Sequence, residues 1–284
     1  MLYQSTRNTR LRETFTDILL TGLAPDGGLY VPEMYPVIDD ETLTAWRGLS
    51  YPELATAIIQ LFVGDAIPND DLQQIVEKTY TQSAFGTEAI VPVRPLWGNL
   101  HIMELSNGPS LAFKDMAMQL LGNLMDYELD RRGQELVILG ASSGDTVSAA
   151  EEAMRGKSNI KVVMLTPKEG MSPFQKAQAG SILDKNIFNV SIDGRFDDCQ
   201  DLVKAVNRDL DFKAAYKIGA VNSINWGRIV AQVVYHCRAY FELSQTNKQD
   251  IDIVVPSGNF GNVLAAHVAK QMGIPIRRLV VATN

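Results

Sequence analysis

The chain has 284 residues, of which 46% are hydrophobic, and a formal net charge of −7. A chain of this length buries a sizeable core. Lysines and arginines are spread along the sequence rather than gathered in runs, which argues against a nucleic-acid partner. The sequence has no apolar run of bilayer length and no signal-peptide core at its start, so we expect a cytoplasmic protein with no membrane partner.

Cysteines and histidines give no sign of a disulfide framework or a metal site. Two cysteines, Cys199 and Cys237, are typical of a reducing compartment, and we expect both to be packed thiols. The three histidines, at positions 101, 236 and 267, do not have metal-ligand spacing. We therefore expect no bound metal.

The first 95 residues carry helical patterns joined by a Pro- and Gly-rich stretch from Ala24 to Pro36. The spacing of apolar residues predicts helices over Leu11–Leu20, Tyr51–Phe62 and Asp70–Thr81. Residues 1–95 are therefore predicted to form a mainly helical N-terminal unit.

After residue 95, strand-like and helical patterns alternate. Strands are predicted at Leu100–Leu105, Glu135–Leu139, Lys161–Leu165, Ile187–Ile192, Ile251–Val255 and Leu279–Ala282. Helices are predicted at Asp115–Arg132, Ser148–Arg155, Ser172–Ala179, Asp197–Leu210, Trp226–Leu243 and Val263–Met272. This alternation predicts an α/β fold of parallel sheets flanked by helices, with ligands held by the loops after the strands. We divide it into an α/β domain over residues 96–225 and the start of a larger one over residues 226–284.

A lysine stands between an extended apolar segment and the long predicted helix, in the stretch Pro109 to Asp115. Lys114, removed from water at such a junction, is suited to bond an aldehyde cofactor and then to move protons. The alternative is a helix-start lysine whose stem packs and whose head reaches water. Asp115 is expected to support the first helical turn through the helix dipole.

A glycine-containing loop links the strand near Ile251 to the helix near Val263. Glycines let the backbone approach a ligand closely, and the free N–H groups of a helix start favour an anion. The loop lacks the spacing of a dinucleotide fingerprint and the ending of a P-loop, which favours a phosphate monoester. The alternative is a tight turn that needs two glycines. The loop consists of Ser257, Gly258, Asn259, Phe260, Gly261 and Asn262.

A second polar loop follows the strand near Glu135, and it gathers hydroxyl groups and backbone donors that can hold a carboxylate. Asp145 in this loop either faces a cofactor hydroxyl or caps the next helix, and Thr146 has the same capping alternative. The loop consists of Ser142, Ser143, Gly144, Asp145 and Thr146.

These three features together resemble the fold-type II pyridoxal-phosphate enzymes, and several phrases narrow the resemblance to the threonine synthases. The phrases occur in family order over nearly the whole chain. They are Gly22-Leu-Ala-Pro-Asp-Gly-Gly-Leu-Tyr-Val-Pro32, Gly108-Pro-Ser-Leu-Ala-Phe-Lys-Asp115, Gly140-Ala-Ser-Ser-Gly-Asp-Thr146, Met171-Ser-Pro-Phe-Gln-Lys176, Val221-Asn-Ser-Ile-Asn-Trp226 and Pro256-Ser-Gly-Asn-Phe-Gly-Asn262.

The resemblance implies a reaction and a set of site residues. The reaction is the conversion of O-phosphohomoserine and water to threonine and phosphate, with pyridoxal 5′-phosphate as cofactor. A related phospholyase, a hydroxy-amino-acid dehydratase and an inactive homologue are the alternatives. Lys114, beside Phe113, would hold the cofactor covalently, the loop 257–262 would cradle its phosphate, and the loop 142–146 would face the substrate. Binding of the substrate phosphate is assigned to two alternative groups, Asn222 and Ser223, or Ser5, Thr6 and Arg7.

This chain departs from the family at three points, of which the first is Asn8, where the family usually has glycine after Ser5-Thr6-Arg7. Val147 stands where the family usually has glycine, and we expect this side chain to crowd the site. Family members also continue well past the equivalent of Asn284. The resemblance therefore implies an incomplete large domain and weak activity for these 284 residues alone.

Overall fold

The computed structural model describes residues 1–219 and 225–283. Its N-terminal part combines helices with an antiparallel sheet whose strand order is β2-β1-β3. The strands are β1 (Leu2–Ser5), β2 (Arg12–Thr14) and β3 (Tyr30–Pro32). The helices are α1 (Phe15–Thr21), α2 (Asp40–Trp46), α3 (Tyr51–Val63), the short 3₁₀ helix η1 (Gly64–Ala66), α4 (Asn69–Thr79) and α5 (Gln82–Phe85).

The sequence predicted the helices of this part better than its sheet. The predicted helix Leu11–Leu20 begins too early, because Arg12–Thr14 pairs with β1. Thr14 then caps α1 by accepting a hydrogen bond from the N–H of Asp17. The other two predicted helices are confirmed by α3 and α4, within two residues at each end.

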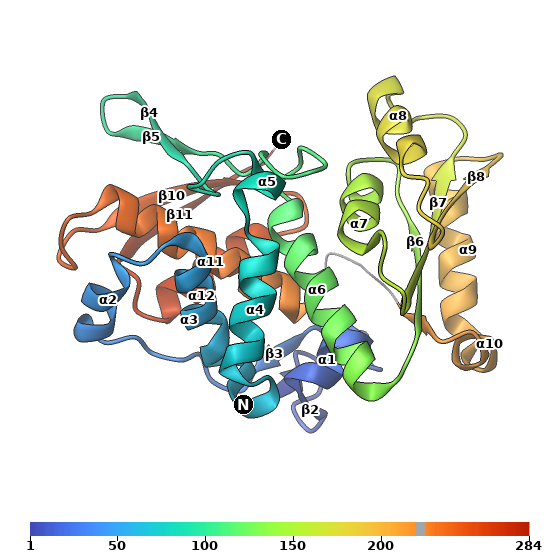
Figure 1. Cartoon of the computed structure of the whole chain (residues 1–284), viewed down its shortest axis with the longest axis horizontal. Helices are drawn as coiled ribbons and strands as arrows, with labels where there is room; N and C mark the ends of the chain where they lie inside the picture. The colour runs from blue at the N-terminus through green and yellow to red at the C-terminus, as the bar shows by residue number, and fades with distance from the viewer. Residues whose placement is uncertain (220–224, 284) are drawn as a thin grey trace.

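An antiparallel hairpin follows, made of β4 (Val93–Trp97) and β5 (Leu100–Met103). The sequence pattern predicted that the strand near Leu100 belongs to a parallel sheet, and that prediction was wrong. Gly98 has a φ of +54° in the turn, which brings the two strands back on each other. The hairpin extends from the body of the molecule (Figure 1), and Trp97 at its tip is 69% exposed.

A four-stranded parallel sheet with the order β8-β7-β6-β9 confirms the predicted α/β fold. Helix α7 contacts β7, and α9 contacts β6 and β7. These two helices lie on opposite sides of the sheet (Figure 1). The strands are β6 (Leu136–Ala141), β7 (Ile160–Pro167), β8 (Ile187–Ile192) and β9 (Ile218–Gly219). The helices are α7 (Thr146–Met154), α8 (Pro173–Ser181), α9 (Phe196–Arg208) and α10 (Leu210–Ala215).

The C-terminal part pairs β10 (Ile251–Pro256) with β11 (Ile276–Ala282) in parallel, joined by α12 (Gly261–Gln271). Beside it lies α11 (Trp226–Leu243), which is buried along most of its length. Helix α11 contacts α3, α12 and the long helix α6 (Asp115–Arg132). It therefore joins parts of the molecule that are far apart in sequence.

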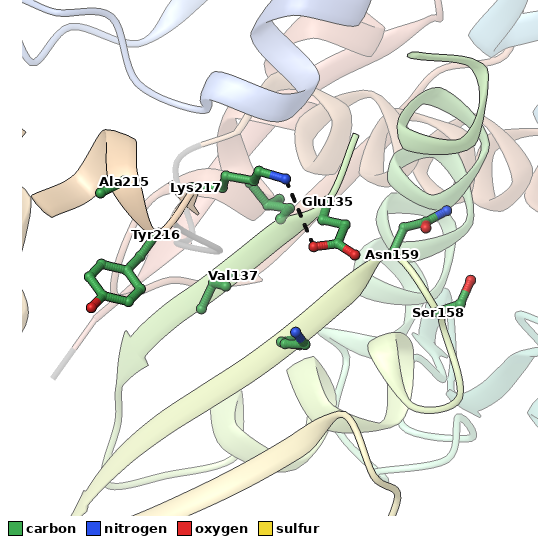
Figure 2. A pocket seen from close by; sticks show the side chains of 9 residues that line it. Glu135, Val137, Ser158, Asn159, Ala215, Tyr216 and Lys217 are labelled. Carbon is green, nitrogen blue, oxygen red and sulfur yellow. Dashed lines mark ion pairs between the residues drawn. The ribbon is translucent and has the colours of Figure 1, made fainter. Parts of the chain in front are cut away.

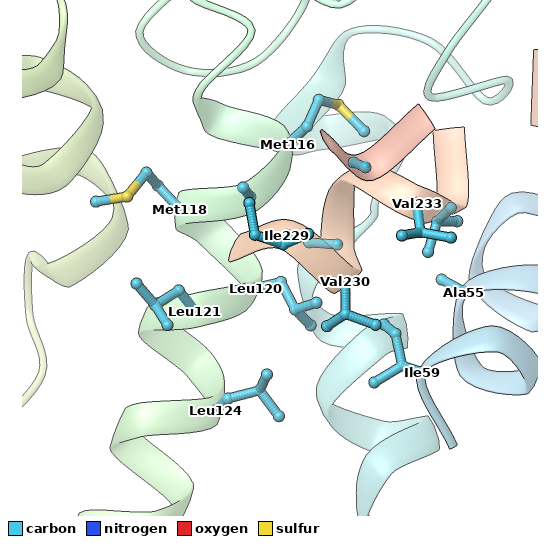
Figure 3. Packing of buried hydrophobic residues seen from close by; sticks show 14 of the residues in the cluster. Ala55, Ile59, Met116, Met118, Leu120, Leu121, Leu124, Ile229, Val230 and Val233 are labelled. Atoms are coloured by element: carbon cyan, nitrogen blue, oxygen red, sulfur yellow. The ribbon is translucent and has the colours of Figure 1, made fainter. Parts of the chain in front are cut away.

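The hydrophobic core is centred on these helices. Figure 3 shows Leu120 and Leu124 of α6 facing Val230 of α11 and Ile59 of α3, and all four side chains are fully buried. Apolar residues recur at helical spacing along α6, and they form the stripe that faces this core. The consequence for the site is a rigid α6, which holds the residue at its start in a fixed place.

One buried cluster includes residues from all three predicted segments. The segment boundaries at residues 95 and 225 stay a prediction, and the second follows directly on residues outside the described part. Among the helices of residues 1–219 and 225–283, none combines the length and the apolar character that a membrane span requires.

Candidate active site

Lys114 lies immediately before α6, and its side chain is 17% exposed. Its Nζ forms an ion pair with Asp145 and lies 5.5 Å from the centroid of the Phe113 ring. The structure thus brings together two residues that the sequence assigned to different loops. The alternative of a helix-start lysine that reaches open water does not fit this position.

The loop before Lys114 is organised by Asp115, a role that the sequence did not predict. Asp115 is fully buried and accepts hydrogen bonds from the backbone N–H of Ser110 at 2.8 Å and from its Oγ at 2.7 Å. A Cβ on Gly108 would lie only 2.4 Å from the Asp115 Cβ, so glycine is required there. Burial raises the pKa of Asp115, and the hydrogen bonds from Ser110 oppose that shift. Asp115 therefore fixes the approach of the chain to Lys114.

The polar loop 142–146 joins β6 to α7, as predicted. The capping alternative for Asp145 is wrong, because its side chain makes no capping hydrogen bond and contacts Lys114 instead. Ser142 Oγ accepts a hydrogen bond from the N–H of Gly144 at 3.2 Å, which fixes the turn. The loop thus presents a carboxylate to the lysine.

Val147 does not stand in the opening of this loop. Its side chain is fully buried and belongs to the hydrophobic core. The expected crowding of the site is therefore not seen, because the side chain packs into the core.

The loop 257–262 joins β10 to α12, and its backbone goes against the alternative of a tight turn that needs two glycines. The left-handed conformation falls on Phe260, with a φ of +60°, and neither Gly258 nor Gly261 has a positive φ. A Cβ on Gly258 would meet no atom within 4 Å, and one on Gly261 would meet only Ile229 at 3.7 Å. The protein itself does not require glycine at either position. The space above both glycines leaves room for the close approach of a ligand.

The start of α12 offers backbone donors to an anion. No side chain caps it, whereas α3 and α8 begin with complete capping boxes. The first N–H groups of an uncapped helix, together with the helix dipole, favour a phosphate group. The donors and open space at Gly258 therefore fit the phosphate of pyridoxal 5′-phosphate, and Lys114 fits its aldehyde.

Helix α11 connects the two halves of the site. Its buried Arg228 interacts with the charge of Asp145, and the next residue, Ile229, lies against Gly261. Burial lowers the pKa of Arg228 to about 10, while Asp145 opposes that shift. We did not predict this helix to be part of the candidate site. The available signal was the spacing of Arg228, Gln232 and His236, which lie four residues apart in the mostly apolar first two thirds of the helix.

The residues assigned to the substrate phosphate are not brought to Lys114 by any described contact. Ser5 Oγ donates to Asp26 at 2.8 Å, and Arg7 Nη1 donates to the backbone oxygen of Asp26 at 3.1 Å. Thr6 Oγ1 accepts from the N–H of Leu29 at 3.1 Å. The other pair, Asn222 and Ser223, lies outside the described residues.

A pocket of about 200 Å³ lies at the opposite end of β6 from this site. Figure 2 shows Glu135 and Lys217 facing each other across it, with an Oε2 to Nζ distance of 3.8 Å. Because the loop 142–146 follows the carboxyl end of β6, this pocket is separate from it. Cys199 and Cys237 do not line this pocket, and both are buried, as expected for packed thiols.

Known proteins are similar to this chain in sequence and in fold. The family model described as threonine synthase N terminus matches residues 2–80. Over the whole chain, the threonine synthase of Methylobacillus glycogenes is 55% identical and that of Saccharomyces cerevisiae 42% identical. The chain spans 61% and 58% of these proteins, respectively.

Two solved structures superimpose on the whole chain. A threonine synthase from Brucella melitensis, solved with bound pyridoxal phosphate, has a TM-score of 0.95 at 45% identity, and the chain covers 61% of it. The yeast threonine synthase has a TM-score of 0.94 at 40% identity, with 58% covered. The fold is therefore that of the fold-type II pyridoxal-phosphate enzymes. Within that class the chain belongs to the threonine synthase family, as the sequence phrases predicted, and it spans about three fifths of the length of these relatives.

Proposed function

We propose that this protein acts with pyridoxal 5′-phosphate to convert O-phosphohomoserine and water to threonine and phosphate. The observation that carries the proposal is the ion pair between Lys114 and Asp145. Each of these residues belongs to one of the sequence phrases that the chain shares with the family. The names of the relatives support the same reaction.

The residues present fit the cofactor at both of its ends. Lys114 supplies an amine for the aldehyde, and the uncapped start of α12 with the loop 257–262 supplies donors for the phosphate. When bound, the cofactor supplies an electron sink for the carbanion that forms on the substrate.

The side chains of this chain then have separate roles in the reaction. Lys114 Nζ would anchor the cofactor and, once free, would take protons from the α and β carbons of the substrate and return them to the γ and α carbons. Asp145 accepts a hydrogen bond from the Nζ group of Lys114 and so orients this group in the site. Ser142, Ser143 and the backbone around Gly144 bind the substrate carboxylate.

Loss of the γ-phosphate and addition of water at the β carbon complete the conversion. The phosphate of the substrate is assigned to Asn222 and Ser223, or to the Ser5, Thr6 and Arg7 segment. We further propose a cytoplasmic location and no nucleic-acid partner, from the charge distribution and the biosynthetic reaction.

Labelling of Lys114 tests the proposal directly. The protein is incubated with pyridoxal 5′-phosphate, reduced with borohydride and digested, and we expect the label on the peptide that contains Lys114. Lys114→Ala should abolish labelling and lower turnover by at least about 1,000-fold, because anchor and base are lost together. Lys204→Ala is the control, since Lys204 pairs with Asp201 on α9, away from the site.

Product analysis separates the reaction from its relatives. Incubation with O-phosphohomoserine should give threonine and phosphate in equal amounts. A keto acid with phosphate would identify a phospholyase instead. A label on another lysine of the folded protein would contradict the site assignment.

A further inference from the structure

Asn262, the second residue of α12, is held by two side chains of the neighbouring helix α11. The Tyr235 hydroxyl lies 2.7 Å from Asn262 Oδ1. His236 Nε2 lies 2.9 Å from the same Oδ1 and 3.1 Å from the backbone oxygen of Asn262. Both Tyr235 and His236 are fully buried. Neither was assigned a role by the sequence or by the proposed reaction.

The partners of His236 determine where its proton lies. Both atoms facing Nε2 are oxygens that only accept hydrogen bonds, so Nε2 carries the hydrogen and Nδ1 does not. Nδ1 is buried and has no partner among the described residues. Burial lowers the pKa of His236 to about 4, while its contacts with Asn262 oppose that shift, so the ring is neutral at physiological pH.

Tyr235 donates to the same oxygen. Burial holds the pKa of Tyr235 well above its usual range, so the hydroxyl keeps its hydrogen. The hydroxyl also lies 3.1 Å from Gln232 Oε1, but it has a single hydrogen, which the shorter contact to Asn262 takes. Asn262 Oδ1 therefore accepts two hydrogen bonds, and both of its lone pairs are used.

The orientation of the Asn262 amide follows from this. With Oδ1 held against α11, only the Nδ2 hydrogens of the side chain remain to interact elsewhere. Asn262 is in the first turn of an uncapped helix, where the backbone donors suit an anion. An asparagine free to rotate would present an oxygen to that anion about as readily as a nitrogen.

We propose that Tyr235 and His236 are positioning residues for the phosphate group of the cofactor: by holding Oδ1 of Asn262, they leave its Nδ2 as an additional donor at the start of α12. This inference deepens the proposed function and rests on the phosphate site assigned there. Neither residue touches the reacting atoms, and both act through Asn262.

A comparison of pyridoxal 5′-phosphate with pyridoxal tests the proposal, because the two differ only in the phosphate. Tyr235→Phe removes one hydroxyl and should weaken binding of pyridoxal 5′-phosphate about 10-fold, the effect of one charge-assisted hydrogen bond. Binding of pyridoxal, measured by borohydride labelling of Lys114, should change less than about 2-fold. Tyr240→Phe is the matched control, because Tyr240 lies on the same helix and its hydroxyl contacts Arg47 instead. That variant should affect neither ligand.

Two further variants separate positioning from packing. His236→Gln keeps an N–H donor and should bind pyridoxal 5′-phosphate within about 3-fold of the original, whereas His236→Leu should lose about 10-fold. Asn262→Asp places a carboxylate in the first helical turn, where the helix dipole tolerates it. Its thermal stability should hold while binding of pyridoxal 5′-phosphate falls by more than about 100-fold.

Binding of inorganic phosphate tests the same site without any bond to Lys114. When phosphate is titrated into ¹⁵N-labelled protein, the amide signals of Gly261 and Asn262 should shift. The affinity for phosphate obtained from these shifts should be about 10-fold lower in Tyr235→Phe. Equal losses of pyridoxal and pyridoxal 5′-phosphate, or no loss of either, would overturn the positioning role. Absence of labelling at Lys114 in the original chain would instead contradict the proposed function, and the phosphate titration would still decide the role of Tyr235.

Discussion

Two glycine loops of this molecule place their glycines in opposite surroundings. At Gly28 an added Cβ would lie 2.1 Å from Ser5 Oγ, and Ser5 and Asp26 satisfy each other's polar groups there. At Gly258 an added Cβ would meet no atom within 4 Å, and the helix start that follows is uncapped. The first loop is closed on itself, and the second is open.

This difference shows how a structural glycine is told from one that serves a ligand. Where the fold fills the space above the glycine, its neighbours explain it. Where the space is empty and backbone donors face it, the explanation lies outside the chain. A second buried group without a full set of neighbours lies in α7, which follows the loop of Asp145. The carboxyl group of Glu151 is fully buried there, and among the described residues only the nearby amide of Asn189 favours its charged form.

The largest expected effect concerns Glu151. Burial raises the pKa of this fully buried carboxyl to about 8, the nearby charge of Glu152 adds to the shift, and the amide of Asn189 opposes it. Below pH 4.5 Glu151 is neutral in both the folded and the unfolded chain. Between pH 4.5 and 8 only the unfolded chain releases the proton, so the free energy of unfolding falls as pH rises, and the loss is complete above pH 8.

Glu151→Gln should remove this loss, which is on the order of 4 kcal/mol at high pH. Urea unfolding of both proteins from pH 4.5 to 9 measures it, and the variant should gain stability relative to the original as pH rises. Glu77→Gln, an exposed glutamate of α4, is the control and should leave the pH dependence unchanged. Parallel pH profiles for the Glu151 variant and the original would contradict the prediction.

The open loop is tested by Gly258→Val. In the proposed phosphate site a branched side chain would fill the open space above Gly258, so affinity for pyridoxal 5′-phosphate should fall about 100-fold. The protein should unfold at nearly the same temperature as the original, because no neighbouring atom is displaced. Cofactor titration with circular dichroism as a check measures both quantities. Unchanged affinity would mean that the loop is only a turn.

The closed loop is tested by Gly28→Ala, which should give the opposite result. The new methyl group collides with Ser5 Oγ and disturbs its hydrogen bond to Asp26, so the protein should lose about 2 kcal/mol of stability. Affinity for pyridoxal 5′-phosphate should stay within about 2-fold. If this variant loses affinity while its stability is unchanged, the distinction between the two loops does not hold.

The sequence predicted those parts of the molecule that repeat a local pattern. Helix α6 begins and ends where its apolar spacing and Gly133 indicate. The parallel strands β6 to β8 begin and end within two residues of their predicted bounds. The strands β1 and β3 were missed because each is only three or four residues long and is stabilised by pairing with a distant partner.

The site was predictable where it follows a phrase of sequence and not where it depends on packing. Lys114 and the loop 257–262 are local features. The contact of Lys114 with Asp145 and the placement of Val147 in the core depend on how α6 and α7 pack, which no local pattern states. The same holds for Phe260, whose left-handed backbone is imposed by its surroundings rather than by its own preference.

The burial of α11 has a consequence for synthesis of the chain. Helices α3 and α6 place apolar side chains against α11, as Figure 3 shows for Ile59, Leu120 and Val230, yet α11 is the last of the three to leave the ribosome. Until it does, the emerging N-terminal portion lacks the surface that completes its core and exposes apolar groups to other chains. We therefore expect folding during translation to be delayed until Leu243 has emerged, with the apolar faces of α3 and α6 exposed before that point.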